Sequence, residues 1–180
     1  LCPGRIQETT GALLGGVPIA ITMTDIHTVG AGGGSIARID EGGALVVGPD
    51  SAGASPGPAC YGVGKEITVT DAKLLLGHLD PNNFLGGRIT LNIDHTRAQM
   101  ETLAAQLQVP QEQAAQGILE VVNSNMERAL RTISLERGFD PRSFTLVPFG
   151  GAGPMHACDL AESLEISTIL IPTIPGVLSA

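Results

Sequence analysis

Apolar residues recur at spacings of three and four along residues 111–137, which is the period of a helix that buries one face. The pattern predicts the longest helix of the chain there, with Gly138 as the residue that ends it. Asn123 stands among apolar neighbours in this segment. We expect it to be a buried polar group that anchors a loop.

Three further helices are expected from the same kind of pattern. One begins at residue 94 or 96 and continues to about 107. A short one is expected over 72–77, capped by Thr70 or Asp71. The last is expected over 154–164, close to the end of the sequence.

Alternation of apolar and polar residues over 35–40 predicts a half-buried strand. The turn chemistry of Glu41-Gly42-Gly43 and the apolar run 44–49 then predict a hairpin. Shorter strands are expected at 17–23, 67–70 and 89–93.

Residues 144–149 and 168–171 are continuous apolar runs, which predict strands buried on both faces. With the helix over 154–164 between them, they predict a right-handed parallel crossover. The pattern of elements is typical of an α/β or an α+β fold, and we take α/β as the expected fold class. The expected organisation is one truncated domain with an irregular insertion, divided as 1–49, 50–110 (the insertion) and 111–180.

Composition narrows the classes of function. The formal net charge is −8 and no cluster of Lys and Arg offsets it, which argues against nucleic-acid or anionic-membrane partners. No apolar run reaches the roughly 18 residues of a membrane span. Three cysteines without a CxxC pair indicate reduced thiols and a cytoplasmic location.

Two glycine-rich segments carry the candidate chemistry. The segment Phe149-Gly-Gly-Ala-Gly-Pro154 follows a predicted strand and begins a predicted helix, the usual position of a ligand in open α/β sheets. Backbone N–H groups there would favour an anion or a sugar oxygen. A tight turn between strand and helix is the alternative.

The other segment, residues 25–35, is neither a P-loop nor a dinucleotide motif. Its run Gly32-Gly33-Gly34 is expected to be either a phosphate nest or a crossing point of the chain. Asp25 and His27 share one side of an extended segment, which suits a metal pair or an acid–base pair. The alternative is a loop-stabilising carboxylate and a hydrogen-bonded structural histidine.

His156 lies in the first turn of the last predicted helix, where the helix dipole disfavours a charged imidazole. As a neutral ring it would either donate to a ligand or be a packed, satisfied histidine. Cys158 on the same helix is expected to be a core residue rather than a nucleophile.

Five motifs occur in order along nearly the whole chain, and together they are specific. They resemble motifs of the A subunit of ATP-dependent hydantoinases, of 5-oxoprolinase, and of the related subunit of acetone carboxylase. They are Asp25-Ile-His-Thr-Val-Gly-Ala-Gly-Gly-Gly-Ser-Ile-Ala37, Gly48-Pro-Asp-Ser-Ala-Gly-Ala-Ser-Pro-Gly-Pro-Ala-Cys-Tyr-Gly62, Thr68-Val-Thr-Asp-Ala72, Phe84-Leu-Gly-Gly-Arg88 and Phe149-Gly-Gly-Ala-Gly-Pro-Met-His-Ala157.

The resemblance implies an actin-like, ribonuclease-H-type ATPase core with a mixed sheet and flanking helices. In that fold Gly150, Gly151 and Gly153 match the segment that touches adenosine. The two phosphate loops of the family lie upstream and do not occur in this sequence, which begins without Met. We therefore expect a C-terminal piece of the core that is inactive alone.

The resemblance also implies an activity. ATP would phosphorylate an amide or carbonyl oxygen and make a cyclic amide, of the hydantoin, N-methylhydantoin or 5-oxoproline type, labile to water. Mg²⁺ or another divalent metal, and a B subunit or B domain, would assist. Asp25 and His27 would be the catalytic and metal-holding pair. Further residues expected to line the cleft are Gly32, Gly33, Gly34, Ser35 and His156.

Two other functions remain open from the sequence. One is the ATP-binding subunit of an acetone-type carboxylase, which shares the motifs. The other is a folded piece without activity that presents a subunit interface. Removal of the first lobe of the ATPase core would expose an apolar face, so we also expect a homodimer.

Overall fold

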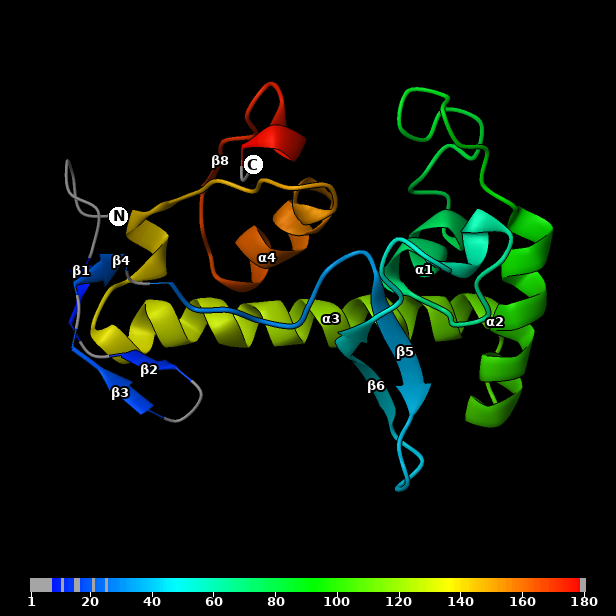
Figure 1. Cartoon of the computed structure of the whole chain (residues 1–180), viewed down its shortest axis with the longest axis horizontal. Coiled ribbons are helices and arrows are strands. Elements are labelled where there is room, and N and C mark those ends of the chain that lie inside the picture. Colours follow the sequence, from blue (N-terminus) through cyan, green and yellow to red (C-terminus); the bar gives the residue numbers. More distant parts are fainter. Residues whose placement is uncertain (1–7, 11, 15–16, 21, 25, 179–180) are drawn as a thin grey trace.

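The computed structural model describes residues 8–10, 12–14, 17–20, 22–24 and 26–178. Helix α3 (Gln111–Ile133) extends along the length of the molecule, and the other helices pack against it. Helices α1 (Val69–Leu75) and α2 (Ile93–Leu107) lie at its N-terminal end, whereas α4 (Ala157–Ser163) lies beside its C-terminal half (Figure 1).

The pattern of apolar residues in α3 explains its central place. Its fully buried side chains recur at helical spacing, and they are Ala114, Ala115, Ile118, Leu119 and Val122. The helix ends earlier than expected, at Ile133. The Ser134 hydroxyl donates to the Leu130 carbonyl, and the chain continues as the 3₁₀ turn η2 (Leu135–Arg137), which Gly138 ends with a φ of 80°.

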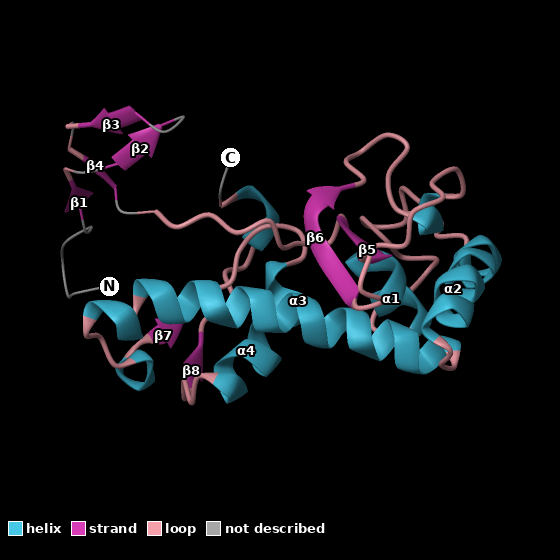
Figure 2. Cartoon of the chain, turned by 90° about the horizontal axis from the view of Figure 1, so that it is seen from below, coloured by secondary structure: helices cyan, strands magenta, loops and turns pink. Residues whose placement is uncertain are grey.

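The predicted hairpin is confirmed as β5 (Ser35–Ile39) paired antiparallel with β6 (Leu45–Ser51). Its turn is held by Asp40, whose Oδ1 accepts from the N–H groups of Gly42 and Ala44 at 2.9 Å each. The hairpin crosses α3, and β6 packs on that helix with Val47 buried (Figure 2).

The N-terminal segment differs from its prediction. The strand expected over 17–23 is divided into β3 (Val17–Ile19) and β4 (Met23–Thr24). These pair antiparallel with β2 (Ala12–Leu14) and β1 (Glu8–Thr9), respectively. Two small ribbons therefore replace one strand.

The strands expected at 67–70 and 89–93 are also wrong, because each is reduced to one isolated bridge, Ile36 with Thr68 and Phe84 with Ile89. Instead, the ends of the two segments form helix starts: α1 begins at Val69 and α2 begins at Ile93. Thr68 caps α1 in a capping box with Asp71, so α1 begins three residues earlier than expected. The cap of α2 is Asn92, whose Oδ1 accepts from the His95 N–H at 2.9 Å.

The C-terminal crossover is confirmed as β7 (Thr145–Leu146) parallel to β8 (Thr168–Ile169). Between them the expected helix is divided into the 3₁₀ turn η4 (Gly153–His156) and α4. The expected burial of both strands is wrong, since Phe149, Leu170 and Ile171 are all more than half exposed. Within the described residues this sheet has two strands, so the residues that follow them lack a further neighbour.

One core joins the three segments of the chain. Its buried apolar residues come from the hairpin (Ala37, Val47), from the expected insertion (Val69, Met100) and from α3 (Ile118). Among the residues that the structure describes, no helix combines enough length and apolar character to cross a membrane.

The Asp71 carboxylate fixes α1 within this core. It is fully buried and accepts four hydrogen bonds: from the Cys60 N–H at 2.7 Å, the Ala59 N–H at 3.2 Å, the Thr68 N–H at 2.8 Å and the Thr68 hydroxyl at 2.7 Å. Burial, followed by the charge of Asp71, raises the pKa of the Cys60 thiol. That thiol therefore stays protonated and unreactive. The core cysteine is Cys60 and not Cys158, whose expected burial is wrong, because Cys158 is exposed.

Replacing Asp71 with Asn should destabilise the chain by about 2–4 kcal/mol, because the amide loses the charge and turns an NH₂ group toward N–H donors. Urea unfolding measures this. Asp94→Asn is the control, since the Asp94 side chain is 97% exposed in the first turn of α2 and should cost well under about 1 kcal/mol. Equal losses for the two variants would contradict the role given to Asp71.

Candidate functional site

The structure brings the two glycine-rich segments together. We call residues 30–34 the first glycine loop and residues 149–153 the second glycine loop. A Cβ atom added to Gly33 would lie 3.2 Å from the Cβ atom of Ala152 and 2.9 Å from the Thr70 hydroxyl oxygen. The first loop therefore packs directly against the second, with α1 beside both, and only a glycine fits at position 33 without a shift.

Several backbone groups of the first glycine loop already have hydrogen-bond partners within the protein. The Gly32 N–H donates to the Ser35 hydroxyl at 2.9 Å, and Ser35 itself is buried. The chain crosses itself here: a Cβ on Gly30 would lie 2.6 Å from the Pro49 Cβ, and one on Gly48 would lie 2.3 Å from the Gly30 carbonyl oxygen. Of the two expected roles for this loop, the geometry favours a crossing point over a phosphate nest.

The second glycine loop leaves an open surface. Gly150 has a φ of 83°, which favours glycine, and its N–H donates to the Pro175 carbonyl at 2.8 Å. Gly151 is exposed, and a Cβ there would meet no atom within 4 Å; at Gly153 the nearest atoms would be 3.9 Å away. A flat group could therefore approach the Gly151 backbone closely.

An apolar groove with a volume of about 350 Å³ adjoins the second glycine loop. His27 and Ala31 line it from the first segment, and Phe149 and Gly153 line it from the second. Helix α3 adds Met126, Ala129, Leu130 and Ile133 to the apolar wall. Sequence reasoning placed His27 in a cleft, and the structure gives it an exposed side chain at this groove.

Asp25, the expected partner of His27, lies outside the described residues. Within the described part of the chain, no three His, Cys, Asp or Glu side chains are grouped so that they could hold a metal ion. His27 is thus the member of the expected pair whose position is known.

His156 is a packed, neutral histidine. It is 1% exposed, and its Nδ1 lies 2.6 Å from the Asn123 Oδ1, while the Asn123 Nδ2 donates to the Asp159 carboxylate at 2.8 Å. Because Asn123 presents its oxygen, Nδ1 of His156 carries the proton. Asn123 thus anchors the segment after the second glycine loop. The Nε2 atom of His156 is buried without a partner in the described structure.

Sequence reasoning missed Lys73, which is 1% exposed on α1. Its ammonium group donates to the carbonyl of Met155, two residues after the end of the second glycine loop, at 2.9 Å. Burial lowers the pKa of Lys73, and the charge of Asp159 opposes that effect. A signal existed: apart from Thr70 and the capping residue Asp71, the residues around Lys73 in α1 are apolar, so the short helix offers little polar surface that would take a lysine to solvent.

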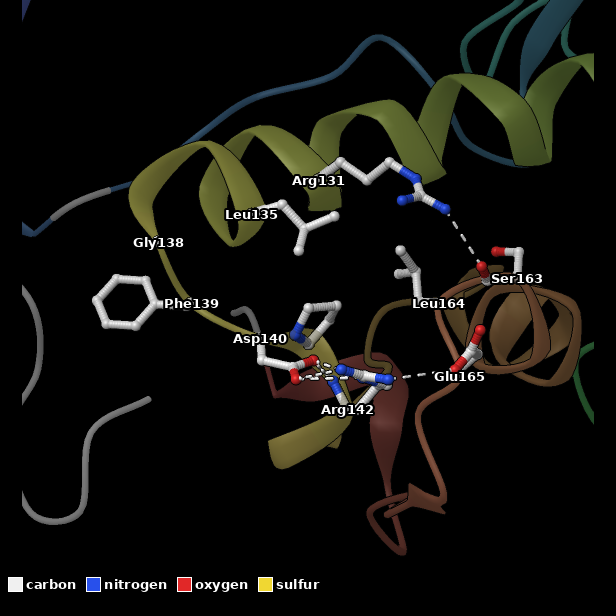
Figure 3. A pocket seen from close by; sticks show the side chains of 10 residues that line it. Arg131, Leu135, Gly138, Phe139, Asp140, Arg142, Ser163, Leu164 and Glu165 are labelled. Carbon is white, nitrogen blue, oxygen red and sulfur yellow. Dashed lines mark hydrogen bonds and ion pairs between the residues drawn. The ribbon is translucent and has the colours of Figure 1, made fainter.

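A second cavity, of about 410 Å³, lies between η2 and the end of α4 (Figure 3). Its cations already have partners, because Arg142 pairs with Asp140 at 2.8 Å and Arg131 donates to the Ser163 carbonyl at 3.3 Å. It shares no lining residue with the groove beside the glycine loops. The groove is therefore the better candidate site.

The pKa of His156 is lowered to about 4, first by burial and then by the charge of Lys73, with Asp159 opposing. An unfolded histidine titrates near pH 6.5, so the unfolded chain binds this proton first as the pH falls. The resulting stability is complete above about pH 6.5 and is lost toward pH 4, by about 3 kcal/mol.

Urea unfolding between pH 4 and pH 7 measures this loss. His156→Gln should flatten the pH dependence, whereas His78→Gln, at an exposed histidine, should leave it unchanged. An imidazole signal of His156 that titrates near pH 6.5 by NMR would contradict the account.

Comparison with known proteins places this geometry in a family. The hydantoinase/oxoprolinase family model matches residues 3–180. The chain is 48% identical over 167 residues to caprolactamase subunit alpha of Pseudomonas jessenii, covering 90% of this chain and 24% of that protein. It is 40% identical over 188 residues to a 5-oxoprolinase of Pestalotiopsis fici, covering 98% of this chain and 15% of that protein.

Two solved structures agree with the fold. The crystal structure of the ATP-dependent caprolactamase from Pseudomonas jessenii superposes with a TM-score of 0.82 at 47% identity, over 88% of this chain and 23% of that one. The nucleotide-free structure of acetone carboxylase superposes with a TM-score of 0.88 at 30% identity, over 96% of this chain and 25% of that one. The chain thus spans a quarter or less of the proteins it matches. The expected fold class, an α/β part of an actin-like ATPase core, is confirmed by these superpositions.

The match of the family model over nearly every residue, together with relatives of high identity and the same fold, shows that this chain belongs to the hydantoinase/oxoprolinase family.

Proposed function

We propose that this chain is part of an ATP-dependent cyclic-amide hydrolase, an enzyme that couples ATP hydrolysis to the opening of a lactam-type ring. The observation that carries the proposal is its superposition on a caprolactamase described as ATP-dependent, at 47% identity and a TM-score of 0.82. The similarity to a 5-oxoprolinase supports the same class of substrate.

We place the adenosine part of ATP at the second glycine loop and the adjoining groove. Three features support this. Gly151 leaves its backbone open to a flat ligand, Gly150 adopts a backbone conformation that favours glycine, and the groove offers an apolar wall for a base. Ordering glycine costs more conformational entropy than ordering other residues. Close approach of a ligand to the backbone explains why glycine occupies these positions despite that cost. When bound, ATP would supply the phosphoryl group that activates the ring amide toward water.

Asp25 and His27 are proposed as the catalytic pair, with Gly32, Gly33, Gly34 and Ser35 near the cleft. His27 borders the groove with an exposed imidazole, a side chain of the kind that serves as a general acid or base. The described residues by themselves do not complete a set of metal ligands, so Mg²⁺ or another divalent metal is assigned no step here.

Assembly with other subunits is part of the proposal. Relatives carry the names caprolactamase subunit alpha and acetophenone carboxylase gamma subunit, and both names denote multi-subunit enzymes. We propose a B subunit or B domain as the partner and a cytoplasmic location. Self-association through the exposed apolar residues after β7 and β8 is the corresponding proposal for a homodimer.

A carboxylase is the second candidate function, favoured by the TM-score of 0.88 to acetone carboxylase. In that case ATP hydrolysis by the complete enzyme would depend on bicarbonate and a ketone. In the proposed hydrolase it would depend on a cyclic amide and water.

The complete enzyme should open caprolactam, 5-oxoproline or hydantoin only when ATP is present, measured as ring-opened product and ADP in equal amounts. His27→Ala should reduce the rate of ring opening by about 100-fold, the usual scale of acid–base help. ATP turnover that needs bicarbonate and a ketone, with no ring opening, would contradict the hydrolase proposal and favour the carboxylase.

Gly151→Leu should raise the Kd for ATP by about tenfold or more, or about 1.4 kcal/mol, because the new side chain would occupy the open surface of the loop. The stability of this variant should be unchanged, because no described atom lies within 4 Å of a Cβ placed at position 151. Calorimetric titration of the complete enzyme measures both binding and its stoichiometry.

Gly176→Leu is the matched control, because a Cβ at Gly176 also meets open space. Tight ATP binding by Gly151→Leu, equal to that of Gly176→Leu and of the unchanged enzyme, would exclude the second glycine loop as the nucleotide site.

A further inference from the structure

Helix α1 contacts the first glycine loop and turn η4, which follows the second glycine loop, through one face. The N–H and the hydroxyl of Thr70 each donate to the Gly33 carbonyl oxygen at 2.8 Å. Three residues later, Lys73 donates to the Met155 carbonyl at 2.9 Å. Residues three apart lie on the same face of a helix, so Thr70 and Lys73 hold the two loops from a common support.

Lys73 is poorly explained as a stabilising residue. Its side chain is 1% exposed, and the described structure gives it one hydrogen bond and no ion pair. A buried ammonium group costs desolvation free energy that a neutral side chain of the same length would avoid. What the charge provides is a strong hydrogen bond to the backbone that follows the second glycine loop.

The support for this contact is rigid on both sides. Asp71, between Thr70 and Lys73, is locked by the four hydrogen bonds from residues 59, 60 and 68. On the other side, Asn123 of α3 binds the ring of His156, the residue next to Met155. Turn η4 is therefore hydrogen-bonded by α1 at Met155 and by α3 at His156, two neighbouring residues.

We propose that Lys73 is a positioning residue for nucleotide binding: with Thr70, it makes α1 a clamp that sets the second glycine loop against the first. This inference rests on the proposed function, in which the second glycine loop meets adenosine. Loss of the Lys73 contact frees the loop to move away from Gly33, so nucleotide binding has to restore the spacing and becomes weaker.

The test uses the complete enzyme with Lys73→Met, which keeps the length of the side chain and removes its charge. The KM for ATP should rise by about tenfold, the ratio expected for one lost hydrogen bond to a charged group, while kcat changes less than about twofold. The melting temperature should not fall, because the desolvation cost disappears with the charge. The exposed Lys65, the only other lysine of the chain, provides the control Lys65→Met, which should change nothing.

Thr70 gives a second, independent pair of variants. Thr70→Val removes the hydroxyl donor to Gly33 at nearly constant shape and should also raise the KM for ATP. Thr70→Ser keeps the hydroxyl and should restore the KM. This rescue distinguishes a clamp from a general loss of packing, which Ser would make worse.

The outcomes separate the two proposals. If the unchanged enzyme binds no ATP in a calorimetric titration, both the proposed function and the proposed role of Lys73 are wrong. If the unchanged enzyme binds ATP and Lys73→Met shows the same KM, the clamp alone is overturned. A lowered kcat and melting temperature with an unchanged KM would likewise reduce Lys73 to a structural residue.

Discussion

The buried carboxylate of Asp71 is the interaction on which the rest of the structure depends. It accepts hydrogen bonds from the backbone N–H groups of Ala59, Cys60 and Thr68, so the 3₁₀ turn η1 (Ala59–Tyr61) and the start of α1 must form together. An ionised group this deep is tolerable only when its oxygens are satisfied. These hydrogen bonds fix the orientation of α1. A helix of only seven residues would not be stable alone.

The two glycine loops use the same residue type for different purposes. Around Gly30, Gly33 and Gly48 the absence of a Cβ permits close packing, of the chain on itself or on the other loop. At Gly151 the absence of a Cβ leaves open surface instead. The difference explains why we assign the ligand to the second loop and a supporting role to the first. Helix α1 joins them, and the groove lined by His27 lies beside the loop that is open.

Helices were predictable from the sequence, and so was the hairpin, because their periods report which face is buried. The β-branched run at 67–70 suggested a strand, but the capping box of Thr68 with Asp71 made it the start of a helix. Burial of Phe149 and Leu170 was wrongly predicted, since hydrophobicity does not reveal which neighbours cover a strand. The motifs gave the family and the second glycine loop. They could not give Lys73, whose role depends on α1 being covered on every side.

Hydrogen–deuterium exchange of the complete enzyme, with and without a non-hydrolysable ATP analogue, tests the central claim most directly. That claim is that α1 holds two adjoining glycine loops as one nucleotide site. The account predicts slower exchange on binding at the amides of residues 150–156, accompanied by slower exchange in residues 30–35, since the loops touch at Gly33 and Ala152. Protection confined to other parts of the enzyme, with both loops unchanged, would contradict it.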